Sequence, residues 1–99
     1  MKLIIAIVRP QCIDKIVVAL EEIENFPGIT VTDVEGFGRR LQTLSYDALN
    51  PFKLKKQMEI AANDEMVEAI VAAIRAHAHT GKKGDGIILV LPVENAVLI

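Results

Sequence analysis

The chain is poor in the residues that mark several classes of protein. It has no tryptophan, aromatic residues make up 4% of it, and Cys12 is the single cysteine. One cysteine excludes an internal disulfide and fits a reducing compartment, so we expect a cytoplasmic protein. The net charge of −2 provides no basic field, which argues against a nucleic-acid partner. No segment approaches the ~20 apolar residues of a membrane span, so membrane insertion is not expected.

Aliphatic residues, by contrast, are abundant. Hydrophobic residues make up 52% of the 99-residue chain, a length that predicts one domain over residues 1–99. A domain of this size buries roughly 65% of the surface of its unfolded chain. We therefore expect apolar surface to remain for a partner, most simply a second copy of the chain.

The first half of the chain shows three patterned segments. Residues 2–8 form a continuous apolar run, which predicts a central strand covered on both faces. Residues 29–35 alternate in polarity and predict a half-buried strand that runs into Gly36. Between them a helix is predicted, which a break at 25–28 ends. Its apolar residues follow helical spacing: Ile13, Ile16, Val17, Leu20 and Ile23.

The second half begins with a segment, 39–53, in which no pattern holds. It predicts a long loop, and such loops are commonly functional. A weaker strand is expected at 54–62, then an N-cap at Asn63, and a last strand at 87–91. The intervening helix, which we expect to close at Thr80-Gly81, has its apolar stripe at Met66, Ile70, Ala73, Ile74 and His77.

This order of elements predicts an α+β, ferredoxin-like βαββαβ fold followed by an apolar C-terminal tail. The tail ends in Ala96-Val97-Leu98-Ile99, which in water would be an exposed apolar edge prone to aggregation. Each of these side chains contributes about 1.5–3 kcal/mol when a neighbouring subunit covers it fully. The tail therefore favours a homo-oligomer.

Two glycine-rich segments are the strongest candidates for a site. Thr80-Gly81-Lys82-Lys83-Gly84-Asp85-Gly86 lies between the predicted helix and the last strand. Glycines permit the positive φ angles that aim successive N–H groups into one anion-binding concavity. The alternative is a helix C-cap followed by a turn, which Gly81 alone explains. The second segment, Gly36-Phe37-Gly38-Arg39-Arg40, follows another strand and favours the functional interpretation.

Four segments together resemble the PII signal-transduction family: Arg9-Pro10, Pro27 to Val34, Gly36-Phe37-Gly38-Arg39, and Thr80 to Gly86. They occur in the order of that family and at nearly its spacing, over essentially the whole chain. The resemblance implies a trimer that binds adenine nucleotides in clefts between subunits. It also implies that the loop at 40–53 docks onto a membrane transporter or an enzyme.

The resemblance assigns roles to particular residues. Tyr46 would take part in docking the partner, although the residues around it do not reproduce the modified-tyrosine motif of the family. The positions implied to bind nucleotide are Ile7, Thr30, Gly36, Phe37, Gly38, Arg39, Lys82, Gly84, Asp85 and Gly86.

The chain departs from the family pattern where charge is needed. Arg40-Leu41-Gln42 replaces the Gln-Lys-Gly that helps hold magnesium and 2-oxoglutarate, so neither of these is expected. Ile87 stands where the family usually places a lysine on the phosphates, and Leu98-Ile99 replaces its Arg-x-Arg-Thr-Gly. Affinity for a triphosphate should therefore be lower than in other members of that family. The candidate ligands are ADP, AMP, ATP or a cyclic nucleotide, and the alternative is that no nucleotide binds.

A metal-associated regulator is the alternative function, because reduced PII proteins and the similarly folded CutA-like trimers are linked to metal tolerance. His77 and His79 are two residues apart, so on a helix they point about 200° apart and cannot share a metal. Cys12 and His77 form a site only if the fold brings them together. Since no Ser-His-Asp set or paired-carboxylate cleft can be identified, we do not expect an enzyme.

Overall fold

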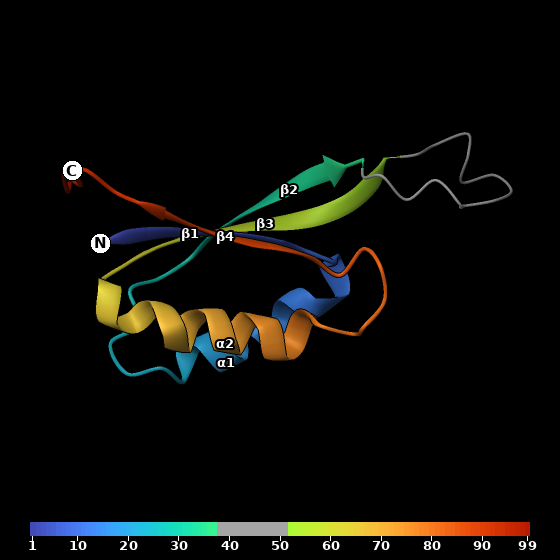
Figure 1. Ribbon diagram of the computed structural model, residues 1–99, viewed down its shortest axis with the longest axis horizontal. Coiled ribbons are helices and arrows are strands. Elements are labelled where there is room, and N and C mark those ends of the chain that lie inside the picture. Colours follow the sequence, from blue (N-terminus) through green and yellow to red (C-terminus); the bar gives the residue numbers. More distant parts are fainter. Residues whose placement is uncertain (38–51) are drawn as a thin grey trace, which may run out of the picture.

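The computed structural model describes residues 1–37 and 52–99. A sheet forms one layer and two helices cover one of its faces, with both chain termini at the same end (Figure 1). The strands are β1 (Lys2–Val8), β2 (Thr30–Gly36), β3 (Lys53–Ala62) and β4 (Gly86–Pro92). The helices are α1 (Ile13–Glu21) and α2 (Val67–Ala78), each preceded by a 3-10 turn, Pro10–Cys12 and Asp64–Met66 respectively.

The sheet is antiparallel throughout, with the strand order β2-β3-β1-β4. In the register, Ile5 of β1 lies opposite Glu59 of β3 and Leu89 of β4. The continuous apolar run predicted a central strand, and β1 is indeed flanked on both sides. This order, with two helices on one face, confirms the predicted α+β ferredoxin-like architecture.

The hydrophobic core lies between the sheet and the helices. In β1 every second residue is buried, because side chains alternate between the two faces of a strand. On the helices the buried positions recur at i and i+4, so that one stripe of each faces the sheet. The core consists of Ile4, Ala6, Val8, Cys12, Ile16, Leu20, Met58, Ile60, Ala62, Ile70, Ile74 and Ala78.

One prediction about the second half was wrong, and one weakly patterned strand was confirmed. His77 was expected on the apolar stripe of α2, but it is exposed and Ala78 is buried instead. The reason is the spacing of Ile70, Ile74 and Ala78, which keeps one helical row against the sheet. The strand expected at 54–62 is present as β3, which has 10 residues and pairs with strands on both sides. Neighbouring strands thus stabilise a segment whose own pattern is poor.

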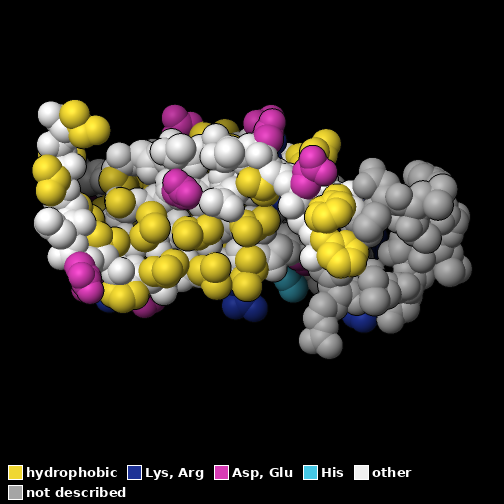
Figure 2. Space-filling model, turned by 90° about the horizontal axis from the view of Figure 1, so that it is seen from above, with side chains coloured by type: hydrophobic (Ala, Val, Ile, Leu, Met, Phe, Trp, Pro, Cys, Tyr) yellow, Lys and Arg dark blue, Asp and Glu magenta, His cyan; other side chains and the backbone are white. Residues whose placement is uncertain are grey.

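The face of the sheet that the helices leave open is strongly apolar. Viewed from that side, hydrophobic side chains form a broad field (Figure 2). Ile87, Leu89 and Leu91 of β4 are 52%, 43% and 39% exposed. The expectation that both faces of β1 are covered therefore fails for a single chain, since the chain supplies helices for one face only. In the described part of the chain, no helix is long and apolar enough to span a membrane.

Candidate functional site

The glycine-rich loop Thr80–Gly86 joins α2 to the start of β4. Among its residues, Gly81, Gly84 and Gly86 have positive φ angles of 85°, 88° and 130°. The loop lies at the end of the sheet where β1 and β2 finish and β3 begins (Figure 1). Helix α2 ends at Ala78, slightly before the predicted Thr80-Gly81, so the whole loop is free to take a non-helical path.

Asp85 organises the first half of this loop. Its carboxylate accepts hydrogen bonds from the amide of Thr80 (2.6 Å), the amide of Gly81 (3.0 Å) and the Thr80 hydroxyl. The Thr80 hydroxyl oxygen in turn accepts a hydrogen bond from the amide of Lys82 at 3.2 Å. These hydrogen bonds of the carboxylate all lie within the loop, so Asp85 stabilises the conformation of the loop.

Two cations outside the loop hold its second half. Arg9, just beyond β1, donates from Nε to the Gly84 carbonyl (3.1 Å) and from Nη2 to the Lys83 carbonyl (2.8 Å). Lys55 of β3 donates from Nζ to the same Gly84 oxygen at 2.9 Å. Arg9 Nη2 also lies 3.5 Å from Asp85 Oδ1. Arg9 was not among the site residues expected from the sequence, although Arg9-Pro10 at the end of the strand was a signal.

These contacts leave an anion-binding surface. The amides of Thr80, Gly81 and Lys82 are used by Asp85 and Thr80, whereas the amides of Lys83 and Gly84 have no partner among the described residues. Successive free N–H groups with lysine side chains beside them are suited to a phosphate or carboxylate. The amides of Lys83 and Gly84, with Lys82 beside them, are therefore the groups of the loop that are chemically suited to an anion.

Gly86 is constrained by its neighbour on β1. A Cβ atom at this position would lie 2.0 Å from the carbonyl oxygen of Ile7 and 3.2 Å from the Cα of Val8. Gly86 pairs with Val8, and the following residue, Ile87, pairs with Ile7. The loop can thus enter the sheet only because Gly86 lacks a side chain. As a result, the backbone of Ile7 lies directly beside Gly86.

The second glycine segment lies at the same end of the sheet but at its other edge. Gly36 ends β2, and the ring of Phe37 lies 5.5 Å from the ring of Phe52. Because β3 and β1 separate β2 from β4, and Gly86 is level with Asp33 rather than with Gly36, Gly36 is roughly 17 Å from the start of β4. Arg39 and its neighbour Gly38 lie outside the described residues, as does Tyr46.

Thr30 is further from the loop. It begins β2, six residues before Gly36. In the register of the sheet it lies level with Glu59 of β3 and Ile5 of β1, two residues away from the level of Ile7. At about 3.3 Å per residue this places Thr30 roughly 20 Å from Gly36 along the strand. A single chain thus brings Ile7 and the loop together, and keeps Gly36 and Thr30 apart from them.

The hydrogen bonds to Asp85 lower its pKa. The Thr80 hydroxyl, the Thr80 amide and, to a smaller extent, the Gly81 amide and the Arg9 charge lower the pKa of Asp85 to about 2. A depressed pKa stabilises the fold above the ordinary value near 3.9, and that contribution is lost as the pH falls through about 2. The loop should therefore keep its form throughout the neutral and mildly acidic range.

Replacing Thr80 by valine tests this electrostatic arrangement. Removing the hydroxyl takes away the largest cause of the low pKa, so we expect the pKa of Asp85 to rise towards its ordinary value. The carboxyl ¹³C chemical shift followed by NMR from pH 6 to pH 2 measures this directly. In parallel, the difference in thermal midpoint between the wild type and Asp85→Asn should be constant above pH 5 and shrink between about pH 4 and pH 2. An unchanged carboxyl titration in Thr80→Val would contradict the assignment.

The candidate metal ligands do not come together in the described part of the chain. Cys12 is buried in the core, His77 is exposed on α2, and His79 Nδ1 lies 3.6 Å from Asp85 Oδ2. Within residues 1–37 and 52–99, no three His, Cys, Asp or Glu side chains are grouped closely enough to hold a metal ion.

Known proteins are similar to this chain over nearly its whole length. The family model of the nitrogen regulatory protein P-II matches residues 1–99. A nitrogen regulatory protein P-II of Azospirillum brasilense is 42% identical over 103 residues, covering 100% of this chain and 91% of that protein. The nitrogen regulatory protein GlnK2 of Haloferax mediterranei is 37% identical, covering 99% and 82%.

A solved structure supports the same conclusion. The crystal structure of Arabidopsis thaliana PII bound to citrate matches with a TM-score of 0.79 and 36% identity, covering 99% of this chain and 79% of that one. PII proteins are trimeric signalling regulators rather than enzymes, and in general they bind adenine nucleotides and 2-oxoglutarate. On the evidence of the matched family model, the relatives and the shared fold, this chain belongs to the nitrogen regulatory P-II family.

Proposed function

We propose that the protein is a cytoplasmic PII-type regulator that forms a homotrimer and binds an adenine nucleotide between subunits. The nucleotide would lie between Gly36–Arg39 of one subunit and Lys82–Gly86 of a neighbour. The observation that supports this most strongly is the glycine-rich loop: Arg9 and Lys55 donate hydrogen bonds to its carbonyls, while the amides of Lys83 and Gly84 have no partner within residues 1–37 and 52–99.

The position of the two segments supports a site shared between subunits. Gly36 and the start of β4 lie at one end of the sheet but at its opposite edges, roughly 17 Å apart in a single chain. A second copy that brings its β2 edge against the β4 edge of the first would join them. Thr30, remote from the loop within one chain, is placed on that same β2 edge.

The nucleotide is expected to be held more by its nucleoside and inner phosphates than by a γ-phosphate. Ile87, at the start of β4 beside the loop, supplies no charge for a phosphate. Each lost contact to a charged phosphate costs about 1.5–3 kcal/mol, or roughly tenfold or more in affinity. We therefore propose ADP, AMP or a cyclic nucleotide as ligands at least as good as ATP.

Calorimetry with ATP, ADP, AMP and cyclic AMP tests the proposal. We expect Lys82→Ala to weaken binding of the preferred nucleotide roughly tenfold while leaving any affinity for adenosine unchanged. Lys15→Ala, on the exposed face of α1, is the matched control and should bind as the wild type does. Dissociation constants in the millimolar range or weaker for all four nucleotides would refute the nucleotide site.

Segment 40–53, which includes Tyr46, is proposed to carry the signal to a membrane transporter or an enzyme. The chain approaches this segment through Gly36 and Phe37 at the end of β2, and the last residues of the segment, Phe52 and Lys53, lie beside them at the start of β3. A ligand at Gly36–Arg39 would act directly on the start of this segment. Nucleotide-dependent affinity for a partner, lost when residues 41–50 are replaced by a glycine-serine linker, is the expected result.

A further inference from the structure

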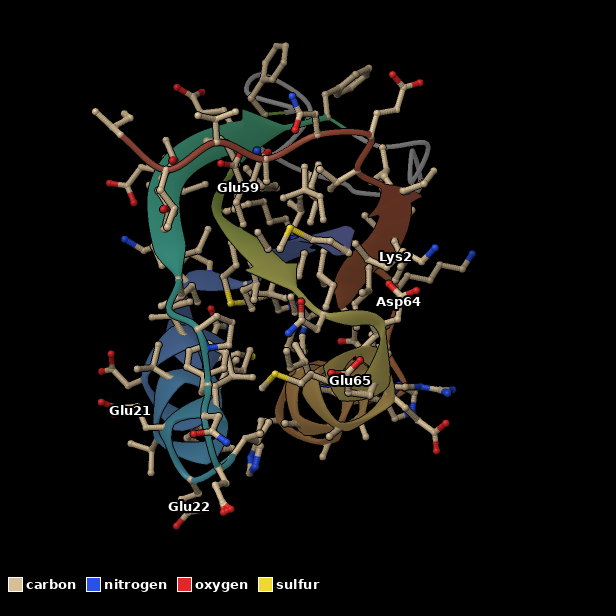
Figure 3. The ribbon with its side chains drawn as sticks, turned by 90° about the vertical axis from the view of Figure 1, so that its left-hand side faces the viewer. Lys2, Glu21, Glu22, Glu59, Asp64 and Glu65 are labelled. Carbon is tan, nitrogen blue, oxygen red and sulfur yellow. The ribbon has the colours of Figure 1, made fainter. Side chains whose placement is uncertain are left out.

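A hollow of ≈ 290 Å³ lies between the second half of α2 and the start of β4, and we call it the α2–β4 hollow. The two helices lie side by side, with α2 on the β4 side of the sheet and α1 on the β2 side (Figure 3). Because β4 is the edge strand of the described sheet, the outer flank of α2 stays open there. The hollow is bounded at one end by Asp85 and Gly86, where the glycine-rich loop enters β4.

The floor of the α2–β4 hollow is apolar. It consists of Val8, Val71, Ala78 and Ile88. Val8 and Ala78 are buried in the core, whereas Val71 and Ile88 are only half-buried. Since burying aliphatic side chains away from water is favourable, a ligand with an aliphatic part gains free energy by covering these two residues.

The rim of the hollow carries positive charge. Arg75 and His79 are four residues apart on α2, so both side chains lie on the same face of the helix, at the hollow. The side chain of Arg75 forms no ion pair or hydrogen bond with any residue of 1–37 or 52–99. Asp85 lies 3.6 Å from His79, but its carboxylate already accepts hydrogen bonds within the loop and lies 3.5 Å from Arg9. The guanidinium of Arg75 therefore lacks a counter-charge, which favours an anionic ligand group beside it.

The distribution of charge along α2 favours one anionic group and not two. A larger, shallower hollow of ≈ 580 Å³ continues from the first along the helix and reaches Glu68. Glu68 precedes Arg75 by seven residues, or roughly 10 Å along the helix axis. A carboxylate is thus attracted at the Arg75 end and repelled at the Glu68 end, so a monocarboxylate fits better than a dicarboxylate.

We propose that the α2–β4 hollow binds a small aliphatic monocarboxylate. The carboxylate pairs with the guanidinium of Arg75 and accepts a second hydrogen bond from His79, while the alkyl chain lies on Val71 and Ile88. The hollow holds the volume of about ten water molecules, which is enough for an acid of about five or six carbons. Such a ligand lies against Asp85, which stabilises the conformation of the loop, but the site does not depend on the proposed nucleotide.

A methyl NMR titration of the full chain with 4-methylpentanoate at pH 7, without nucleotide, tests the site. We expect saturable shifts of the Val71 and Ile88 methyl signals with a dissociation constant of about 1 mM. The amide 4-methylpentanamide has the same shape without the charge, and acetate has the charge without the alkyl chain. Each should bind roughly tenfold more weakly than the acid. Equal binding of the acid and either analogue, or no saturable shift with the acid, would overturn the proposed ligand class.

The role of Arg75 is tested by substitution. Arg75→Ala should abolish the difference in affinity between the acid and its amide. His77→Ala is the matched control, because His77 belongs to the same end of α2 but lines the groove between α1 and α2. This control should bind the acid as the wild type does, and an equal effect of both substitutions would contradict the recognition by Arg75. A protein that binds the acid but none of the four nucleotides would refute the proposed function and leave this site standing.

Discussion

Replacing Gly86 by alanine is expected to destabilise the protein by more than about 3 kcal/mol, or to prevent folding. Gly86 has a φ of 130°, which L side chains rarely adopt, and its added Cβ would lie 2.0 Å from the Ile7 carbonyl oxygen. That oxygen belongs to the backbone of the central strand, so it cannot move without disturbing the pairing of β1 with β4. Urea unfolding followed by far-UV circular dichroism measures the loss.

Gly28→Ala is the matched control for this prediction. Gly28 has a φ of 118°, but nothing lies within 4 Å of an added Cβ. Its substitution should cost only the strain of the backbone conformation, on the order of 1–3 kcal/mol. Equal losses at both positions would show that the conformation of Gly86, and not its approach to β1, determines its requirement.

The second large effect is expected at the open face of the sheet, where Leu89→Glu should convert the proposed trimer into monomers. Leu89 is 43% exposed in the single chain and lies opposite Ile5 in the apolar field. Burying a leucine fully contributes about 1.5–3 kcal/mol, and an unpaired buried carboxylate costs several kcal/mol more. In a trimer the change occurs three times. Sedimentation velocity at micromolar concentration distinguishes the two states.

Val18→Glu provides the comparison for this substitution. Val18 is 59% exposed on α1, so its replacement by glutamate makes a similar change of polarity on the helical side of the molecule. This variant should sediment as the wild type does, and both variants should keep wild-type circular dichroism. A Leu89→Glu protein that remains trimeric would place the subunit interface elsewhere and remove the basis for a site shared across the sheet edges.

The contacts of Arg9 link the loop to the central strand. Arg9 follows β1 immediately, and its guanidinium holds the carbonyls of Lys83 and Gly84 and lies near Asp85. An anion bound to the amides of the loop therefore acts on a segment anchored to the middle of the sheet. This gives the proposed ligand a rigid support, since an anchored loop loses less conformational freedom when it binds.

Much of the fold could be predicted because its signals are local. The apolar run at 2–8 predicted the central strand, and helical spacing predicted the buried positions Ile16 and Leu20. Glycines with neighbouring lysines predicted the loop at 80–86. Such features depend on the alternation of a strand or the period of a helix, which a stretch of ten residues already displays.

Other features depend on contacts between distant parts of the chain. Arg9 reaches Gly84 across 75 positions, and Lys55 reaches it across 29. Nothing in the local sequence of either cation indicates a carbonyl as its partner. The exposure of His77 likewise follows from how α2 is rotated on the sheet, which its neighbours Ile74 and Ala78 determine.

The sequence by itself determined the order of the elements, the polarity of each face and the position of the glycine-rich loop, because these depend on residues close together in the chain. Only the tertiary structure decided that Asp85 is used to shape that loop, that Gly86 must pass within van der Waals contact of β1, and that Gly36 and Thr30 lie away from the loop in one chain. Those outcomes depend on the register and order of strands, and register is set by the packing of the whole sheet against its helices.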